Sequence, residues 1–326
     1  MQKKKLSEIE LNTTLIGDCR ETLKQLPDGC INACITSPPF YALRDYQEEN
    51  QIGLEKTPDE YVEELVKVFR EVKRVLREDG NLWLNLGDTY SSHKDCKSIS
   101  QTLSIDTGSE QAHIIDKGRA ASRDSKMLKE QGLKNKELIG IPWKVAFALR
   151  EDGWYLRQDI IWSKKNNMPE SVKDRCTKSH EYIFLMTKNP TYYYDHEAIK
   201  EDAVRAGSIP KGKKYSSELA DNKIGGKHTR ETLNEKPVAA KKNKRSVWTV
   251  ATRPFKDAHF AVFPPDLIEP MVLAGCPEKG IVLDPFMGSG TTGMVAQSLG
   301  RSWIGCELNP EYVEMQRKRT SQQSLF

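Results

Sequence analysis

Seven short apolar runs, separated by amphipathic stretches, constrain the fold of this chain more than any other feature. The runs are residues 13–17, 31–36, 81–87, 158–163, 182–187, 281–286 and 302–307. Between them, residues 58–79, 141–153 and 265–275 have helical patterns. Gly80 is expected to end the first helix, whose apolar face carries Tyr61, Leu65, Val68, Phe69, Val72 and Leu76. Strands that alternate with helices predict an α/β protein with a doubly wound parallel sheet.

The composition is that of a protein with a hydrophobic core and a mildly basic surface. Of 326 residues, 37% are hydrophobic, and the formal net charge of +4 permits nucleic acid as a partner without requiring it. The 7 cysteines form no Cys-x-x-Cys pair, which favours reduced thiols and a cytoplasmic location. The 6 histidines form no ligand-spaced cluster, so no metal is expected. Because no apolar run approaches the roughly 20 residues that span a bilayer, no membrane partner is expected either.

Two polar stretches interrupt the alternation of strands and helices. Residues 91–138 are rich in Ser, Lys and Asp, and residues 197–247 are strongly basic and rich in Gly, Ser and Lys. This composition is typical of solvated or disordered segments, and it also fits insertions that order on contact with a polyanion. Both stretches are therefore expected to be insertions into the sheet domain.

A glycine-rich turn near the end of the sequence indicates a nucleotide-type cofactor site. Residues 282–300, VLDPFMGSGTTGMVAQSLG, have the order strand, glycine turn, helix, and glycines let a backbone approach a ligand closely. A tight turn without a ligand is the simpler explanation of a bare Gly-x-Gly. A triphosphate is excluded, because no Lys-Ser/Thr pair follows Gly290. Glu307 ends the next strand about 20 residues on, where such sites place an acid on the ribose hydroxyls.

The position of this turn indicates a permuted fold. In an ordinary doubly wound fold the glycine turn opens the domain, whereas here it follows most of the strands. The earlier strands must supply the other half of the sheet, which predicts a circular permutation. ITSPPF, residues 35–40, then ends a strand abruptly, because proline cannot donate to a strand ladder. That end lies at the carboxyl edge of the sheet, where ligands bind.

These ordered motifs resemble those of the β-class, amino-methylating DNA methyltransferases. GDCRETLKQLPDGCINACITSPPFY and NLWLNLGDTY come first, and FPPDL, DPFMGSGTT and GCELNPEY follow much later. The resemblance covers most of the chain outside the two insertions. It implies a circularly permuted Rossmann-like, S-adenosylmethionine-dependent methyltransferase, with a mostly parallel seven-stranded sheet and helices on both faces. Residues 1–326 would form a single catalytic domain interrupted by residues 91–138 and 197–247.

The resemblance also implies the ligands and the residues that contact them. The cofactor would be S-adenosyl-L-methionine, the substrate double-stranded DNA, and a cognate restriction endonuclease of a restriction–modification system a candidate partner. Asp18 would lie near the adenine, FPPDL against the methionine part and Glu307 on the ribose. The expected cofactor-binding residues are Asp18, Phe263, Pro264, Leu267, Asp284, Phe286, Gly288, Gly290, Thr291 and Glu307. Residues 197–247 are the expected target-recognition region, with residues 91–138 second, and the candidate phosphate contacts are Lys211, Lys213, Lys214, Lys241, Lys242, Lys244 and Arg245.

The expected catalytic residues are Ser37, Pro38, Pro39 and Phe40. The target amino group lies inside the duplex, so the base must be extruded into the pocket, where Phe40 can stack on it. Its nitrogen is a weak nucleophile. By the resemblance, the Ser37 hydroxyl and the Pro38 carbonyl accept its protons, and the prolines hold that carbonyl in place. Cys30 and Cys34 are expected to be core residues. Tyr41 could share the stacking role of Phe40, but an ordinary packed aromatic is the stronger interpretation.

The sequence leaves several alternatives open. Within the family, Ser before the two prolines accompanies cytosine and Asp or Asn accompanies adenine, so Ser37 favours N4 of cytosine over N6 of adenine. A protein-glutamine methyltransferase is disfavoured, because its cofactor glycines precede the Pro-Pro motif. A non-catalytic DNA-binding protein with the same fold is a third alternative. WSKKNNMPES, residues 162–171, resembles the segment that borders the target-base pocket, and Asp88 is either a proton relay or a structural cap.

Overall fold

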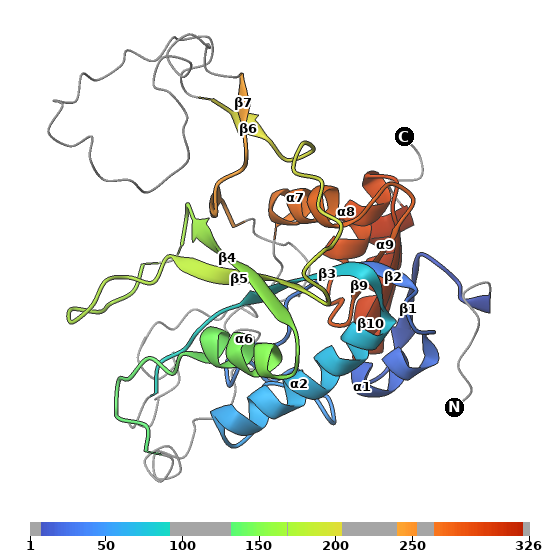
Figure 1. The fold of residues 1–326 in the computed structure, drawn as a ribbon. Coiled ribbons are helices and arrows are strands. Elements are labelled where there is room, and N and C mark those ends of the chain that lie inside the picture. Colours follow the sequence, from blue (N-terminus) through green and yellow to red (C-terminus); the bar gives the residue numbers. More distant parts are fainter. Residues whose placement is uncertain (1–7, 92–131, 168, 204–239, 253–263, 322–326) are drawn as a thin grey trace, which may run out of the picture. The chain divides into compact units, whose positions relative to one another are not determined.

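One eight-stranded sheet organises the computed structural model, which describes residues 8–91, 132–167, 169–203, 240–252 and 264–321. Its strand order is β1-β10-β9-β2-β3-β5-β4-β8 (Figure 1). β5 is antiparallel to both of its neighbours, and the other pairs are parallel. The strands are β1 (Thr13–Ile16), β2 (Ile31–Thr36), β3 (Leu76–Leu86), β4 (Tyr155–Lys164), β5 (His180–Thr187), β8 (Val247–Val250), β9 (Ile281–Asp284) and β10 (Ser302–Glu307).

The seven predicted runs all lie on strands of this sheet, and an eighth strand joins them. β8 consists of the residues VWTV and pairs in parallel with β4, Trp162 opposite Trp248. The prediction of seven strands therefore missed one. Four residues with Val247 exposed and Trp248 buried are too short to show a period, and only the pairing with β4 makes them a strand.

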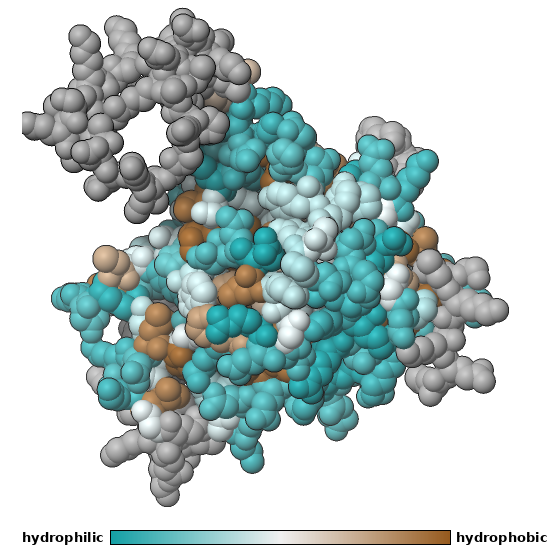
Figure 2. All heavy atoms as spheres, in the orientation of Figure 1, coloured by the Kyte–Doolittle hydropathy of each residue, from teal (hydrophilic) through white to brown (hydrophobic). Residues whose placement is uncertain are grey.

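Helices cover both faces of the sheet, as Figure 1 shows. The short helix α1 (Cys19–Thr22) and the 3-10 helix η2 (Leu23–Gln25) lie near α2 (Pro58–Val75), which packs on α6 (Ile141–Glu151). α7 (Pro265–Gly275), α8 (Thr291–Ser298) and α9 (Pro310–Ser321) pack together from the C-terminal part of the chain. Hydrophilic side chains cover most of the face in Figure 2, including the outer side of α2. This arrangement is the predicted doubly wound α/β fold.

The longest helix begins as its sequence indicates but ends earlier than expected. Thr57 and Glu60 form a capping box at the start of α2, and the six residues of the predicted apolar face are fully buried. Gly80 does not end the helix, which stops at Val75. Leu76 instead begins β3 and pairs with Ile31, and pairing then resumes between Asn81 and Ala33. The apolar Leu76 pairs in the sheet although it also continues the helical pattern. Residues 77–80 follow it as an irregular segment of β3, where the pairing register shifts.

The two predicted insertions have different outcomes. The described residues of the basic stretch, 196–203 and 240–245, group apart from the rest of the described chain as a second unit. In this unit β6 (Glu201–Asp202) pairs antiparallel with β7 (Lys241–Lys242). Val247, the last residue of the expected insertion, is the first residue of β8. The ends of the other stretch, residues 91–138, meet where Tyr90 and Leu138 form an antiparallel bridge.

The strand order brings the two predicted motifs together. β2 and β9 are parallel neighbours, with Ala33 opposite Val282 and Cys34 opposite Leu283. Their carboxyl ends lie at the same edge, so the residues after Thr36 and the glycine turn after Asp284 meet there. Cys30, which directly precedes β2, and Cys34, within β2, are both buried, as predicted for core residues. Tyr41 is buried too, with its ring 5.4 Å from that of Tyr61.

Candidate active site

A pocket of about 720 Å³ lies at the carboxyl ends of β1, β2, β9 and β10. One end is lined by the glycine turn and Glu307, and the other by Ser37, Trp162, Lys164 and Glu181. Small-molecule sites usually have ~300–1,000 Å³, so this pocket has room for a substantial ligand. Five of the residues predicted to bind a cofactor thus line the same pocket as the four predicted to act on the base; the five are Asp18, Phe286, Gly288, Thr291 and Glu307.

Asp284 joins the two motifs below the floor of the pocket. Its carboxylate is 2% exposed and accepts hydrogen bonds from the Thr36 hydroxyl (2.6 Å), the Thr292 hydroxyl (2.7 Å) and the Phe286 amide (3.0 Å). Burial raises the pKa of Asp284 to about 6, and these donors oppose the rise. Thr36 directly precedes Ser37, so one carboxylate ties the end of the catalytic strand to the glycine turn. Asp284 therefore organises the site from within, where the sequence predicted a ligand contact.

Glu307 lies at the pocket surface, at the end of β10. Its two carboxylate oxygens accept hydrogen bonds from the Gly288 amide (2.7 Å) and the Asn309 amide (2.9 Å). Each oxygen retains a further acceptor position for a ligand donor. Burial raises the pKa of Glu307 to about 7. An acceptor in this place fits the ribose hydroxyls that the sequence predicted as its partners.

The glycine turn is supported from behind by α9. Gln316, 1% exposed, donates to the Gly288 carbonyl (2.7 Å) and accepts from the Thr14 hydroxyl (2.6 Å). The Arg319 guanidinium donates to the Ser289 carbonyl and hydroxyl, both at 2.8 Å. Gly290, which precedes α8, has φ +82°, and a Cβ there would lie 2.9 Å from Gln316 Cγ. Glycine is required here both by the backbone conformation and by the close approach of α9.

The motif predicted to be catalytic follows β2, as expected, and all four of its residues line the pocket: Ser37, Pro38, Pro39 and Phe40. The Ser37 hydroxyl donates to Asn85 Oδ1 at 3.0 Å. The Pro39 carbonyl instead accepts from the Tyr61 hydroxyl at 2.8 Å, so this carbonyl is used in packing. The Phe40 ring lies against Gly87, where an added Cβ would be 2.4 Å from Phe40 Cε2. Gly87 of the LGD segment therefore leaves the room that this ring occupies.

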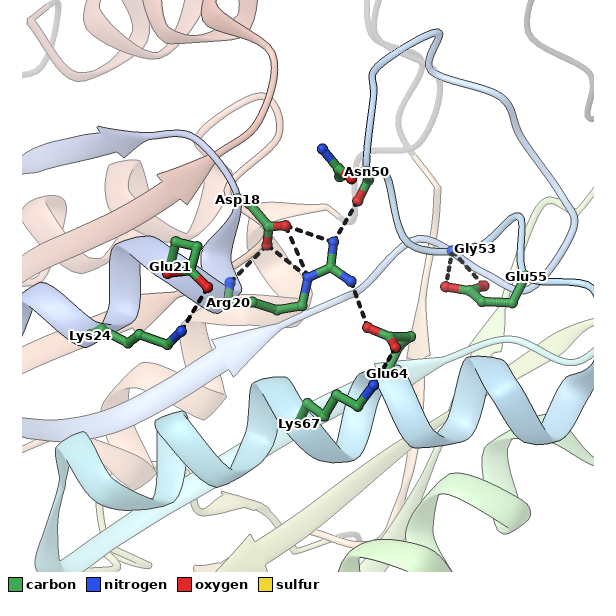
Figure 3. A network of polar contacts seen from close by, with 9 residues as sticks. All are labelled: Asp18, Arg20, Glu21, Lys24, Asn50, Gly53, Glu55, Glu64 and Lys67. Carbon is green, nitrogen blue, oxygen red and sulfur yellow. Dashed lines mark hydrogen bonds and ion pairs between the residues drawn. The ribbon is translucent and has the colours of Figure 1, made fainter.

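Asp18 reaches the pocket rim, but its carboxylate already has a partner. It caps α1 by accepting from the Arg20 amide (2.8 Å), and its Oδ2 accepts from the Arg20 guanidinium at 2.6 Å (Figure 3). The same guanidinium donates to Glu64 at 2.5 Å and to the Asn50 carbonyl at 2.9 Å. Arg20 thus ties the loop that follows Phe40 to α1 and α2. That loop lines the pocket with Leu43, Arg44, Tyr46, Gln51 and Ile52.

The remaining residues predicted to bind the cofactor differ in their position relative to the pocket. Phe286, Gly288 and Thr291 line it, whereas Pro264 and Leu267 are buried at the start of α7 and are not among its lining residues. Phe263 lies outside the described residues. So do three of the candidate phosphate contacts, Lys211, Lys213 and Lys214.

The other candidate phosphate contacts belong to the unit of residues 196–245. Lys241 and Lys242 form β7, and both Lys242 (3.4 Å) and Arg245 (2.6 Å) pair with Glu201. Lys244 is of intermediate exposure. This part of the unit therefore presents a basic strand whose charge Glu201 partly neutralises.

Asp88 is a structural cap. Its carboxylate accepts from the backbone amides of Gly140 and Ile141, each at 3.0 Å, at the start of α6. Of the two roles left open by the sequence, the structure supports the cap. No proton step is assigned to Asp88.

Several pocket residues escaped sequence analysis. Asn85 lies within an apolar run, and Glu181 directly precedes another. A polar side chain in or beside a strand was the only sequence feature that could have indicated them. Lys164 lies in the segment of residues 162–171, whose sequence does not single it out from its neighbours. Arg44 and Tyr46 carried no signal, because irregular loops place side chains by tertiary contacts. The helix residues Gln316 and Arg319 looked like an ordinary polar face.

Comparison with known proteins confirms the class that this site indicates. The family described as DNA methylase (N6_N4_Mtase) matches residues 31–318. The Type II methyltransferase M.Cfr9I of Citrobacter freundii is 43% identical over 315 residues, covering 94% of this chain and 87% of its own. M.SmaI of Serratia marcescens is 42% identical over 305 residues, covering 94% and 89%.

Solved structures share the fold. The PvuII DNA methyltransferase, described as cytosine-N4-specific, has a TM-score of 0.60 at 20% identity, over 94% of this chain and 87% of its own. A DNA modification methylase from Thermus thermophilus, solved with S-adenosyl-L-methionine, has a TM-score of 0.54 at 21% identity, over 94% of each chain.

The sheet, the glycine turn and the acid after β10 define an S-adenosylmethionine-dependent methyltransferase. The chain belongs to the DNA methylase family of N6- and N4-amino methyltransferases, whose substrate is DNA. The cofactor fits the residues present, because the glycine backbone and the Glu307 acceptors line a pocket open to Ser37. Within the described ranges, no group of three or more His, Cys, Asp or Glu side chains is arranged to hold a metal ion. Among the helices that the structure describes, none is long and apolar enough to cross a membrane.

Proposed function

We propose that this enzyme transfers a methyl group to N4 of a flipped cytosine in duplex DNA. The observation that carries the proposal is the position of Ser37, at the end of β2 and in the same pocket as the glycine turn and Glu307. A serine before the two prolines is the family feature that accompanies cytosine. The PvuII enzyme, described as cytosine-N4-specific, shares the fold.

The proposed cofactor contacts combine the geometry of the pocket with the family resemblance. Glu307 accepts hydrogen bonds from the ribose hydroxyls, and the backbone of Gly288 and Gly290 allows close approach of the ligand. Asp18 borders the adenine, held in its orientation by Arg20. The FPPDL segment, with Phe263, Pro264 and Leu267, remains the proposed support of the methionine part. S-adenosylmethionine supplies an electrophilic methyl group on a sulfonium sulfur.

The residues at the other end of the pocket act on the base. The extruded base stacks on Phe40, a contact worth about 1–3 kcal/mol for base–aromatic pairs. The Ser37 hydroxyl oxygen and the Pro38 carbonyl accept hydrogen bonds from the two amino protons. These acceptors draw the nitrogen toward a tetrahedral shape, in which its lone pair is free to attack. Because Asp284 fixes the end of β2, the acceptors are in place before the base arrives.

The identity of the methylated base is tested by digesting DNA from cells that express the protein to nucleosides. The proposal expects N4-methylcytidine as the deoxynucleoside, and N6-methyladenosine alone would assign the enzyme to the other amino group. Single-molecule sequencing of the same DNA gives the sequence context. A cognate restriction endonuclease is proposed as a partner, and it must fail to cut DNA that this enzyme has methylated.

The role of Ser37 is tested by Ser37→Ala. Loss of one preorganised hydrogen-bonding group costs roughly 10²–10³ in rate, and we expect a decrease of this order in methyl transfer. Cofactor affinity, measured by calorimetry, should stay within about twofold, because Ser37 lies at the base end of the pocket. A collapse of cofactor affinity with unchanged turnover of the bound cofactor would contradict the assignment.

A further inference from the structure

A chain of polar side chains leads from Ser37 to the opposite wall of the pocket. The Ser37 hydroxyl donates to Asn85 Oδ1 (3.0 Å), and Asn85 Nδ2 donates to Glu181 Oε2 (3.2 Å) and to the Tyr182 carbonyl (3.1 Å). Asn85 is 4% exposed, so water does not compete for these bonds. Asn85 comes from β3 and Glu181 from β5, which pair with each other in the sheet.

The partners of Asn85 decide which way its amide faces. Both groups near Nδ2, a carboxylate and a backbone carbonyl, can only accept hydrogen bonds, and Nδ2 has two protons to donate. The reversed amide would place Oδ1 against these two acceptors and leave the bonds unmade, which is costly at a buried position. Oδ1 must therefore face Ser37. Ser37 can meet Oδ1 only by donating its single hydroxyl proton.

Glu181 is itself held in place by a cation. Its Oε1 pairs with the Lys164 ammonium, with side-chain exposures of 12% for Glu181 and 23% for Lys164. The same ammonium lies 4.7 Å from the centre of the Trp162 ring, whose Nε1 donates to the Val250 carbonyl at 2.9 Å. Strands β4, β5 and β8 thus fix the carboxylate that orients Asn85.

We propose that Glu181 is a positioning residue that, through Asn85, fixes the Ser37 hydroxyl as a hydrogen-bond acceptor toward the target amino group. A hydroxyl has one proton and two lone pairs. Since the proton is committed to Asn85, only lone pairs face the pocket, and these suit the protons of an amino group. Without Glu181, Asn85 can turn, donate to Ser37, and leave the hydroxyl proton facing the substrate.

This inference rests on the proposed amino-group transfer but does not depend on which base carries the amino group. The wild-type product is therefore identified first. If it is N6-methyladenosine, the cytosine assignment fails and the role of Glu181 is still tested on adenine. If the wild-type protein transfers no methyl group to DNA, both proposals are overturned.

The test is a double-mutant cycle on single-turnover methyl transfer, with Ser37→Ala and Glu181→Leu. We expect Glu181→Leu to lower the rate about tenfold to a hundredfold, with cofactor affinity unchanged. In the Ser37→Ala background the same substitution should have almost no further effect, because Glu181 acts through Ser37. Equal factors in both backgrounds would overturn the proposal, since they would mean an independent role for Glu181.

Two further variants make the result specific. Glu181→Gln keeps an acceptor for Asn85 and should lose less activity than Glu181→Leu; an equal loss contradicts the positioning role. Glu78→Leu is the matched control, because Glu78 also pairs with a lysine, Lys188 (2.7 Å), but is not among the residues lining the pocket. If Glu181→Leu does not fold, Asn85→Ala replaces it in the cycle. If Asn85→Ala lowers the rate by the same factor with and without Ser37→Ala, the proposal is overturned, because Glu181 is proposed to act on Ser37 only through Asn85.

Discussion

At the scale of single residues, the cofactor end of the pocket depends on a carboxyl group whose charge changes near neutral pH. Burial raises the pKa of Glu307 to about 7, so the group is mostly ionised at pH 8 and mostly protonated at pH 6. The ionised form has acceptor positions for both ribose hydroxyls, and protonation removes acceptor capacity. With the proposed contact between Glu307 and the ribose, cofactor binding is coupled to this titration.

We predict that the Kd for S-adenosylmethionine rises about tenfold as the pH falls from 8 to 6. Calorimetry across this range measures the change. Glu307→Gln should bind more weakly at pH 8 and show a flatter pH profile. A wild-type profile as flat as that of the variant would contradict the role of Glu307.

The same titration affects the stability of the protein without cofactor in the opposite direction: protonation of Glu307 favours the folded state. Glu307 has a higher pKa in the folded state than its ordinary value of 4.5, so the folded protein binds more protons between these values. The free energy of unfolding should therefore fall as the pH rises from about 4.5 to 7, by roughly 2–3 kcal/mol from this group. Urea unfolding at pH 5 and pH 7 measures the change, and Glu307→Gln should reduce it. An unchanged difference in the variant would assign the effect to other groups.

Gly87 leaves room for the Phe40 ring, the proposed aromatic platform for the base. The Phe40 ring lies against it so closely that any Cβ must displace the ring. Gly87→Ala should therefore lower methyl transfer about tenfold or more while leaving cofactor affinity unchanged. The fluorescence of 2-aminopurine at the target position reports base extrusion, and we expect a weaker signal from the variant. Gly132→Ala is the control. A Cβ at Gly132 would have no neighbour within 4 Å, so this variant adds backbone strain from its positive φ without displacing a side chain.

At the scale of elements, α9 acts as a support for the glycine turn that precedes α8. Gln316 donates a hydrogen bond to Gly288, and Arg319 donates to Ser289 and Thr291. These three residues flank Gly290 in the turn. Removing Gln316 leaves the Gly288 carbonyl without that donor, and a lost partner at a buried site costs about 1–3 kcal/mol. We therefore expect cofactor affinity to depend on α9, a helix that is not itself part of the glycine motif.

We predict that Gln316→Leu and Arg319→Met each raise the Kd for the cofactor roughly tenfold. Lys318→Met is the control on the same helix, because the Lys318 side chain is 72% exposed and pairs with Glu314 at 3.9 Å, away from the glycine turn. Thermal unfolding distinguishes a local effect from loss of the helix. Equal affinity of all three variants would show that the glycine turn keeps its shape without α9.

At the scale of the whole molecule, the chain combines a catalytic sheet with a separate basic unit, residues 196–245. We propose that this unit recognises DNA, with phosphates contacted by its basic residues. Each phosphate contact contributes about 0.9 to the slope of log K against log salt concentration. Replacing Lys241, Lys242, Lys244 and Arg245 by Gln should therefore lower the slope by about 2–4.

Fluorescence anisotropy with a labelled duplex at several salt concentrations measures this slope. Lys24→Gln and Lys318→Gln are the controls, because they remove positive charge from the other unit. Cofactor binding should be the same in all variants. A slope equal to that of the wild type would place the DNA contacts outside these four residues.

Local signals along the chain were enough to locate most elements and to order the motifs. Apolar runs and turn residues act over a few positions, and they located seven strands, four helices and both the Ser-Pro-Pro-Phe and glycine motifs. The resemblance carried by these motifs gave the family and the cofactor, which the comparisons confirm. Local signals failed where a residue had two uses, as at Leu76, which completes a helical face and also begins a strand.

Which residues meet depends instead on long-range packing. Asp284 touches Thr36 across 248 positions of the chain, Gln316 supports Gly288 from another helix, and Glu181 orients Asn85 from a neighbouring strand. None of these pairs has a sequence period, because each depends on strand order and on packing across the sheet. The residue types of the two motifs are therefore readable from the chain, whereas the β2–β9 and β3–β5 pairings and the packing of α9 determine which side chains act together with them.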